Sequence, residues 1–73
     1  MTQVCFRDDK GHAVHSHMLC TGETIEQAMK FVQGRVRFAR PVSRVELMTY
    51  NPDLKGKFDH EDRPDLLATV KGW

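Results

Sequence analysis

The chain has 73 residues, of which 40% are hydrophobic and 29% charged, and its formal net charge at pH 7 is +1. This length allows one domain with a thin core, and the composition is typical of a folded protein and excludes intrinsic disorder. No apolar run approaches the roughly 18 residues that cross a bilayer, and the N-terminus lacks the pattern of a secretion signal. We therefore expect a single cytoplasmic domain over residues 1–73 that does not bind membranes.

The N-terminal part of the chain is predicted to be a β-hairpin. Apolar and polar residues alternate on both sides of the turn-rich stretch over residues 8–12. If Gly11 takes the left-handed bulge position after a type I turn, the register of the two strands follows from the turn. In that register Cys5 lies opposite His15.

A capping box predicts where the first helix begins. The Thr24 hydroxyl can accept hydrogen bonds from the first backbone amides, and Gln27 can reach back to the cap. Gly34 is predicted to end this helix as a left-handed cap. Phe31 falls off the apolar stripe and is interpreted as the edge of the core, with a contact surface as the alternative. The stripe itself consists of Ile25, Ala28, Met29 and Val32.

A third strand is predicted over residues 43–50, where apolar side chains recur at every second position. The turn residues 51–53 end it. The C-terminal part favours a short helix over residues 64–70 with Asp62 as its cap, and an edge strand over 66–70 is the alternative.

These elements define an α+β fold in a ββαβ arrangement. We expect a three-stranded antiparallel sheet of order 2-1-3, with one helix on one face and a short C-terminal helix or edge strand. The other face of the sheet is then bare. The residues expected on it are Cys5, Arg7, His15, His17, Arg44, Glu46, Met48 and Tyr50.

A metal site in the hairpin is one hypothesis. Cys5, His15 and His17 supply the thiolate and imidazole ligands that zinc accepts. Their spacing matches no standard zinc pattern, so solvated strand positions are the favoured interpretation and no metal or cofactor is predicted. Cys5 and Cys20 are expected to be free thiols. A Cys/His nucleophile pair lacks an oxyanion hole and an orienting acid, so no catalytic residue is assigned and the chain is not expected to be an enzyme.

Charge is the least random feature of the sequence. No acidic residue lies between Glu26 and Glu46. Arginine suits phosphate or carboxylate groups because its planar guanidinium makes paired hydrogen bonds. The alternative is that these cations pair with the acidic tail, which contains Asp59, Glu61, Asp62 and Asp65. The cations of this basic segment, which are the candidate partner-binding or nucleic-acid-binding residues, are Lys30, Arg35, Arg37, Arg40 and Arg44.

The middle of the chain is similar to a known family. The segment 24–30, with sequence TIEQAMK, is followed by VSRVE over residues 42–46. Together they resemble the helix-then-strand core of small phage-encoded anti-CRISPR proteins that act on type I-F systems. The resemblance implies a stoichiometric inhibitor that covers the DNA path of a guide-RNA surveillance complex. The tails do not correspond, and no functional residue is transferred.

The sequence therefore favours a small non-enzymatic binding protein, of phage or mobile-element type, that engages a larger protein or nucleoprotein through its basic segment. Direct binding of nucleic acid is the first alternative, and a metal-binding hairpin is the second. An unpaired outer strand or the flank at Phe31 leaves a homodimer open.

Overall fold

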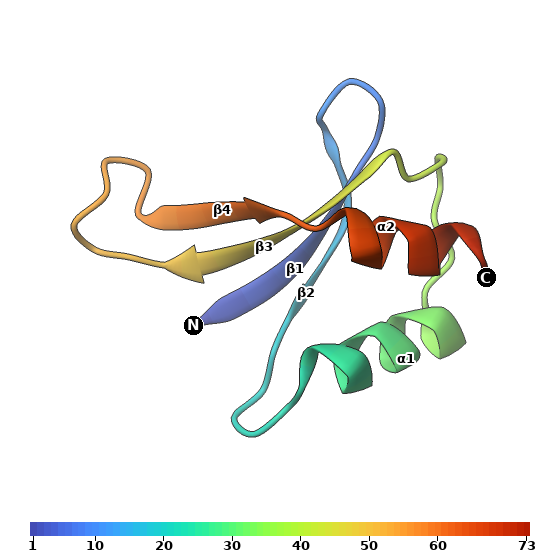
Figure 1. Ribbon diagram of the computed structural model, residues 1–73, viewed down its shortest axis with the longest axis horizontal. Coiled ribbons are helices and arrows are strands. Elements are labelled where there is room, and N and C mark those ends of the chain that lie inside the picture. The colour runs from blue at the N-terminus through green and yellow to red at the C-terminus, as the bar shows by residue number, and fades with distance from the viewer.

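The structure is a computed structural model that describes residues 1–73, and it shows a small α+β domain (Figure 1). A four-stranded antiparallel sheet has the order β2-β1-β3-β4. In chain order the elements are β1 (Thr2–Arg7), β2 (Ala13–Met18), α1 (Ile25–Arg35), β3 (Arg44–Tyr50), β4 (Phe58–Asp62) and α2 (Pro64–Lys71). The α+β class and the antiparallel sheet agree with the sequence prediction.

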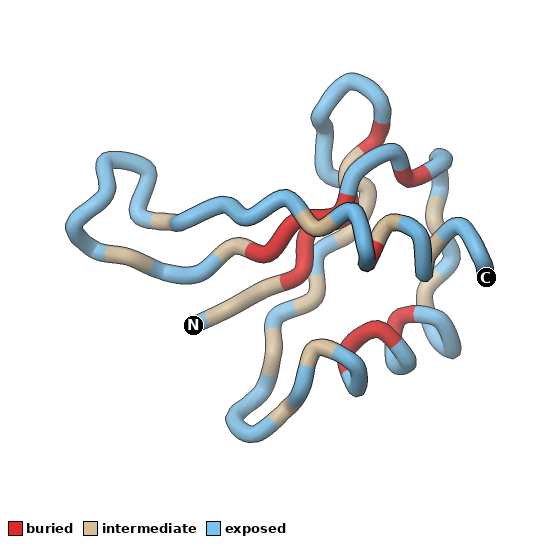
Figure 2. Tube along the Cα trace, viewed as in Figure 1, coloured by how far each residue is buried: buried red, intermediate tan, exposed pale blue.

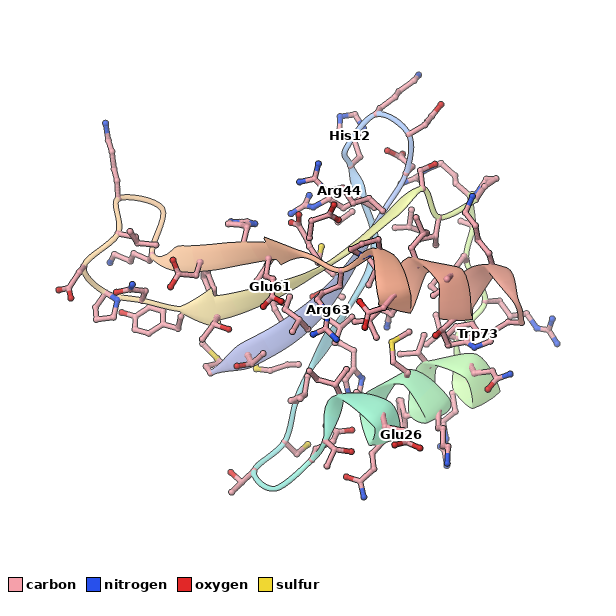
Figure 3. All side chains as sticks on the ribbon, in the orientation of Figure 1. His12, Glu26, Arg44, Glu61, Arg63 and Trp73 are labelled. Carbon is pink, nitrogen blue, oxygen red and sulfur yellow. The ribbon has the colours of Figure 1, made fainter.

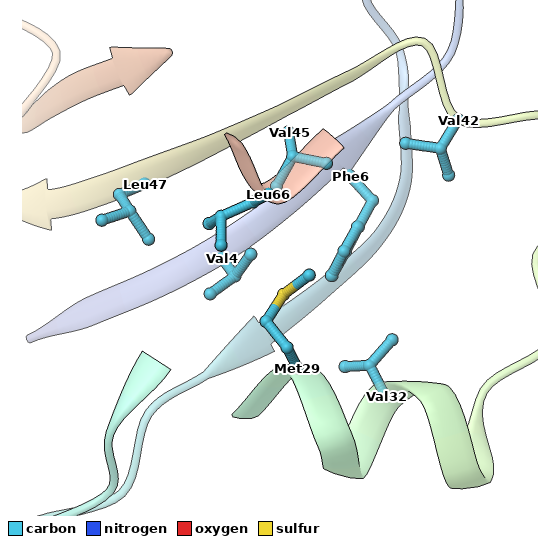
Figure 4. Close-up of a cluster of buried hydrophobic side chains, with 8 residues drawn as sticks. All are labelled: Val4, Phe6, Met29, Val32, Val42, Val45, Leu47 and Leu66. Carbon is cyan, nitrogen blue, oxygen red and sulfur yellow. The ribbon is translucent and has the colours of Figure 1, made fainter. Parts of the chain in front are cut away.

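Both helices contribute side chains to one core on one face of the sheet (Figure 4). Alternation along β1 and β3 directs their apolar residues toward the helices, because successive side chains of a strand point to opposite faces. The core cluster consists of Val4, Phe6, Met29, Val32, Val42, Val45, Leu47 and Leu66. Buried residues gather around the central strands and on α1, whereas the loop between β3 and β4 projects away and is exposed (Figure 2).

The three-stranded order predicted from the sequence was wrong in one respect, because β4 adds a fourth strand beside β3. Four of its five residues are ionisable, a composition disfavoured in strands, so β4 gives no apolar alternation. Charged residues are tolerated there because β4 is an edge strand. Asp62, the predicted cap of the C-terminal helix, lies in β4, and Arg63 occupies the cap position instead. The C-terminal segment is a helix and not an edge strand. Pro64 begins that helix, where its missing N–H costs nothing.

The predicted turn of the hairpin is confirmed, but the predicted register is not. The Asp8 amide donates to the His12 carbonyl at 2.9 Å, and Gly11 has φ of +81°. A bulge then shifts the register, since Ala13 pairs with Arg7 but His15 pairs with Phe6. The extra residue between them is Val14. As a consequence, every residue of β2 beyond the bulge lies on the opposite face from the one expected.

The capping box at the start of α1 is present. The Gln27 amide donates to Thr24 Oγ1 at 3.1 Å, and the Thr24 amide donates to Gln27 Oε1 at 2.9 Å. Gly34 does not cap the helix, contrary to the prediction, because α1 continues through it and ends at Val36 in an extended conformation. Val36 packs against the core, so the chain leaves the helix extended rather than left-handed.

Replacing Thr24 with alanine removes the hydroxyl that caps α1. We expect a loss of about 1 kcal/mol in the free energy of unfolding, because an amide at the helix start loses its acceptor. Chemical denaturation followed by circular dichroism measures this loss. Thr21→Ala is the matched control, since Thr21 is exposed in the preceding turn and makes no side-chain hydrogen bond. Equal stability of the two variants would show that the cap is not formed.

Two surface features complete the fold. Neither helix has the length and apolar character needed to span a membrane. Phe31 does not lie at the edge of the core as expected, because its side chain is 46% exposed on α1. Its ring instead lies 5.2 Å from that of His17, and the Arg35 guanidinium lies 5.1 Å from its centroid.

Candidate binding groove

The cations of the basic segment do not form one free surface. Arg44 binds Glu46 at 2.8 Å, and Arg40 binds Asp8 at 2.9 Å. Lys30 lies 3.6 Å from Glu26 on the exposed side of α1. From the sequence, these cations were expected to form a free basic surface, and for Arg44, Arg40 and Lys30 that expectation was wrong. Their ion-pair partners are Glu26, Asp8 and Glu46, none of which belongs to the acidic tail. The tail residue Asp62 adds only a weaker electrostatic attraction to Arg44.

Asp8 has a structural role that explains the position of Arg40. Its carboxylate is buried and accepts hydrogen bonds from the Lys10 and His12 amides at 3.0 and 2.9 Å. Burial by itself raises the pKa of Asp8, but the bonds from the His12 amide, Arg40 and the Lys10 amide outweigh it and hold the pKa below its ordinary value. Arg40 thereby ties residues 36–43, the connector between α1 and β3, to the tip of the hairpin.

A groove of about 710 Å³ lies between this connector and the last turn of α2. Its volume is in the range of small-ligand sites. The connector leaves α1 extended at Val36 and returns to the sheet at Val42, while Leu66 holds α2 against the core. Figure 3 shows Trp73 at the C-terminal end of α2, between the ends of both helices. The floor of the groove is formed by apolar side chains, which include Val36, Phe38, Val42, Val70 and Trp73.

Two aromatic rings distinguish the floor of the groove. Phe38 is half-buried and packs on Phe6, with ring centroids 5.2 Å apart. The Trp73 ring lies nearly parallel to the Phe38 ring, at 8° between the ring planes and 6.3 Å between the centroids. Trp73 remains 40% exposed. The groove therefore exposes aromatic apolar surface to solvent.

The rim of the groove is basic. Arg37, Arg40 and Lys71 line it, and no aspartate or glutamate does. Arg37 and Lys71 make no ion pair within the protein, whereas Arg40 shares its charge with Asp8. An apolar floor with a cationic rim can bury an apolar group while pairing with an anion beside it.

Arg35 and Lys30 lie outside the groove. Arg35 occupies the last turn of α1, where a cation is favourable for the helix dipole, and it covers the Phe31 ring. Of the sequence-predicted binding residues, the structure thus brings Arg37 and Arg40 to one site and leaves Lys30, Arg35 and Arg44 elsewhere. Sequence reasoning missed Lys71 and Trp73, whose only signal was their place at the end of a predicted helix.

The open face of the sheet carries a second polar cluster, centred on Glu46. This carboxylate is only 1% exposed and receives Arg7 Nε at 2.7 Å and His60 Nδ1 at 3.0 Å on one oxygen. Arg44 binds the other oxygen and projects toward solvent (Figure 3). Burial raises the pKa of this carboxyl, but the hydrogen bonds from His60, Arg44 and Arg7 lower it to about 2.

The shared metal site of Cys5, His15 and His17 is excluded by the register. Cys5 pairs with Ser16 and faces the open side of the sheet, while His15 and His17 pair with residues of the core and face the helices. His15 packs beside Phe6 and Phe38, and His17 binds Glu23 at 3.1 Å. No group of three or more His, Cys, Asp or Glu side chains is close enough to hold a metal ion.

The same separation removes the Cys/His nucleophile pair. Burial raises the pKa of the Cys5 thiol, against the lowering effect of Arg7, so the thiol is further from ionisation than an ordinary cysteine. Cys5 and Cys20 are both free thiols, as expected. Cys5 serves as a small apolar side chain beside Glu46.

Comparison with known proteins adds no relative to this description. The chain matches no family model, and neither a curated protein nor a solved structure is similar to it.

Proposed function

We propose that this chain is a non-enzymatic binding protein that engages an acidic segment of a larger protein or nucleoprotein through the groove beside the connector. One observation carries the proposal: an apolar floor is bordered by Arg37, Arg40 and Lys71 and by no Asp or Glu side chain. The preferred ligand is then a peptide that places an apolar side chain on the floor and carboxylates at the rim.

Several properties of the groove support a peptide rather than a small metabolite. The groove is open to solvent. Its two cations without protein partners lie in different segments, Arg37 in the connector and Lys71 in α2. Arginine and aromatic side chains are enriched in protein interfaces and dominate their binding energy. The resemblance to anti-CRISPR inhibitors adds a guide-RNA surveillance complex to the partners that the proposal covers.

Selection of random peptides displayed on phage tests this proposal directly. Peptides enriched on the wild-type chain are expected to carry net negative charge and an aromatic or bulky aliphatic residue. The Arg37→Glu/Lys71→Glu double variant is expected to lose this preference, because both unpaired cations become anions. Lys55→Glu/Lys57→Glu is the control, since both lysines are exposed in the loop between β3 and β4, far from the groove.

The selection has a clear opposing outcome. If wild-type peptides show no acidic preference, or if the groove variant retains the same preference as the wild type, the groove is not an acidic-peptide site. Circular dichroism of each variant before selection establishes that a lost preference reflects lost binding rather than unfolding.

Direct binding of single-stranded nucleic acid is a second candidate, favoured by the nearly parallel rings of Phe38 and Trp73. Single-strand binding sites combine stacked aromatic rings with a basic groove. Trp73 is the only tryptophan, so its fluorescence reports on the groove without a label. Titration with oligothymidylate is expected to quench it at low salt and to lose affinity steeply as salt rises, if this candidate is right. Unchanged fluorescence with the oligonucleotide rejects this candidate.

A further inference from the structure

The two outer strands of the sheet differ sharply in charge. β4 carries Asp59, Glu61 and Asp62, which discourage another strand from pairing with it. β2 contains no Lys, Arg, Asp or Glu and no proline. One edge of the sheet is therefore protected against strand addition by charge and the other is not.

Beyond Ala13, whose carbonyl accepts a hydrogen bond from Arg40 at 3.3 Å, the backbone of β2 offers hydrogen-bonding groups without a partner strand. The Leu19 amide donates to the Thr2 carbonyl at 2.9 Å, which sets the alternation along the β1–β2 pair. In an antiparallel pair, every second residue directs its N–H and C=O to the neighbouring strand. His15 and His17 accordingly face β1, whereas Ser16 and Met18 direct their backbone groups away from the sheet.

Apolar side chains lie beside this edge on both faces of the sheet. On the helix side, the exposed ring of Phe31 packs against His17. On the open side, Met18 is 53% exposed. Large apolar groups that flank an unpaired edge are typical of an interface, because strand addition at the edge covers them.

We propose that β2 pairs with β2 of a second copy of this chain, antiparallel about a two-fold axis, so that the two sheets become continuous. β2 suits self-pairing because it contains no Lys, Arg, Asp or Glu, so two copies of it do not repel each other through like charges. Burial and the neighbouring His17 hold the pKa of His15 below its ordinary value, which keeps its ring neutral near pH 7. A two-fold axis makes the contact self-complementary and closed.

The dimer and the proposed peptide groove use different residues. No residue of β2 lines that groove, so each copy keeps its own groove open. An assembly with two grooves gains avidity for a partner that presents two acidic segments. Failure of the dimer would leave the groove proposal unchanged, and failure of peptide binding would leave the dimer unchanged.

Amide hydrogen exchange of the full chain, measured by NMR at low and high protein concentration, tests the pairing residue by residue. The amides of His15 and His17 are expected to be protected at both concentrations, because they bond to β1. The amides of Ser16 and Met18 are expected to become protected only at high concentration, as the dimer forms. Sedimentation equilibrium over the same range is expected to show the mass rising from monomer to dimer.

Met18→Lys supplies the matching perturbation, because an edge lysine opposes strand pairing. We expect the dimer dissociation constant to rise about tenfold or more. Leu54→Lys is the control, since it also replaces an exposed apolar side chain with lysine, but in the loop between β3 and β4. Ser16→Pro is the second variant, because it removes an outward amide without removing a bond to β1, and it is expected to abolish the dimer.

Three results would overturn the inference. The first is a wild-type chain that stays monomeric into the millimolar range, which would leave the edge free for a strand of another protein. The second is protection of Ser16 and Met18 that does not change with concentration. The third is a dimer that neither Met18→Lys nor Ser16→Pro weakens relative to Leu54→Lys.

Discussion

Phe6→Ala is expected to cost about 3–5 kcal/mol in the free energy of unfolding, the range for removing a fully buried aromatic ring. Domains this small often have a total stability of only about 5 kcal/mol, so much of the variant would be unfolded at room temperature. Phe6 is fully buried on the central strand β1 and contacts the rings of His15 and Phe38. Urea denaturation followed by circular dichroism measures the loss.

This substitution also tests how the groove is held. Phe38 packs on Phe6, so the cavity left by removing the Phe6 ring lies directly beneath the groove floor. In the folded fraction of Phe6→Ala, we expect altered Trp73 fluorescence because Trp73 stacks beside Phe38. Phe58→Ala is the control, since Phe58 packs only edge-on against Tyr50 on the exposed β4 edge and should cost less than about 1.5 kcal/mol. Similar losses in both variants would contradict this account of the core.

Sequence patterns located the elements whose signals are local. The capping box at Thr24 placed the start of α1 correctly, because a cap is read from residues three apart. The end of α1 was misplaced, because Gly34 is only permissive for a left-handed cap and the core contact of Val36 decides the path. β4 was missed because its charges are acceptable only at a sheet edge, which is a property of the assembled sheet.

The histidines show how one local irregularity changes a functional prediction. The turn at Gly11 was predicted correctly, yet the bulge at Val14 reversed the faces of β2. Nothing in the alternating pattern marks that bulge. His15 then packs between aromatic rings of the core, where a metal hypothesis for the open face no longer applies.

The groove could be predicted only in part for a similar reason. The basic segment of the sequence predicted a binding site in this region, and Arg37 and Arg40 of that segment do line the groove. Trp73 and Lys71 reach it because Leu66 docks α2 on the core, a contact between distant parts of the chain. The pairing of Arg40 with Asp8 depends equally on the folded hairpin.

Glu46→Gln is expected to lower the free energy of unfolding at pH 7 by about 3 kcal/mol. Glu46 is almost fully buried and joins strands β1, β3 and β4 through Arg7, Arg44 and His60. Removing its charge leaves the Arg7 guanidinium, itself mostly buried, without a counterion. Asp53→Asn is the control, because Asp53 is exposed in the loop after β3 and forms no ion pair.

The pH dependence of stability distinguishes the contribution of the Glu46 charge from the contribution of its packing. Its pKa in the folded protein is about 2, below the ordinary value of 4.5, so the folded state favours the ionised form. The resulting stability, roughly 3 kcal/mol for a difference of this size, is fully present above about pH 5 and is lost as the pH falls from there toward 2. Glu46→Gln has no such proton to bind, so its stability should fall less steeply than that of the wild type over this range. Urea denaturation at a series of pH values should therefore show the two stabilities converging as the pH approaches 2. Parallel curves for the two proteins would mean that Glu46 contributes packing and not charge.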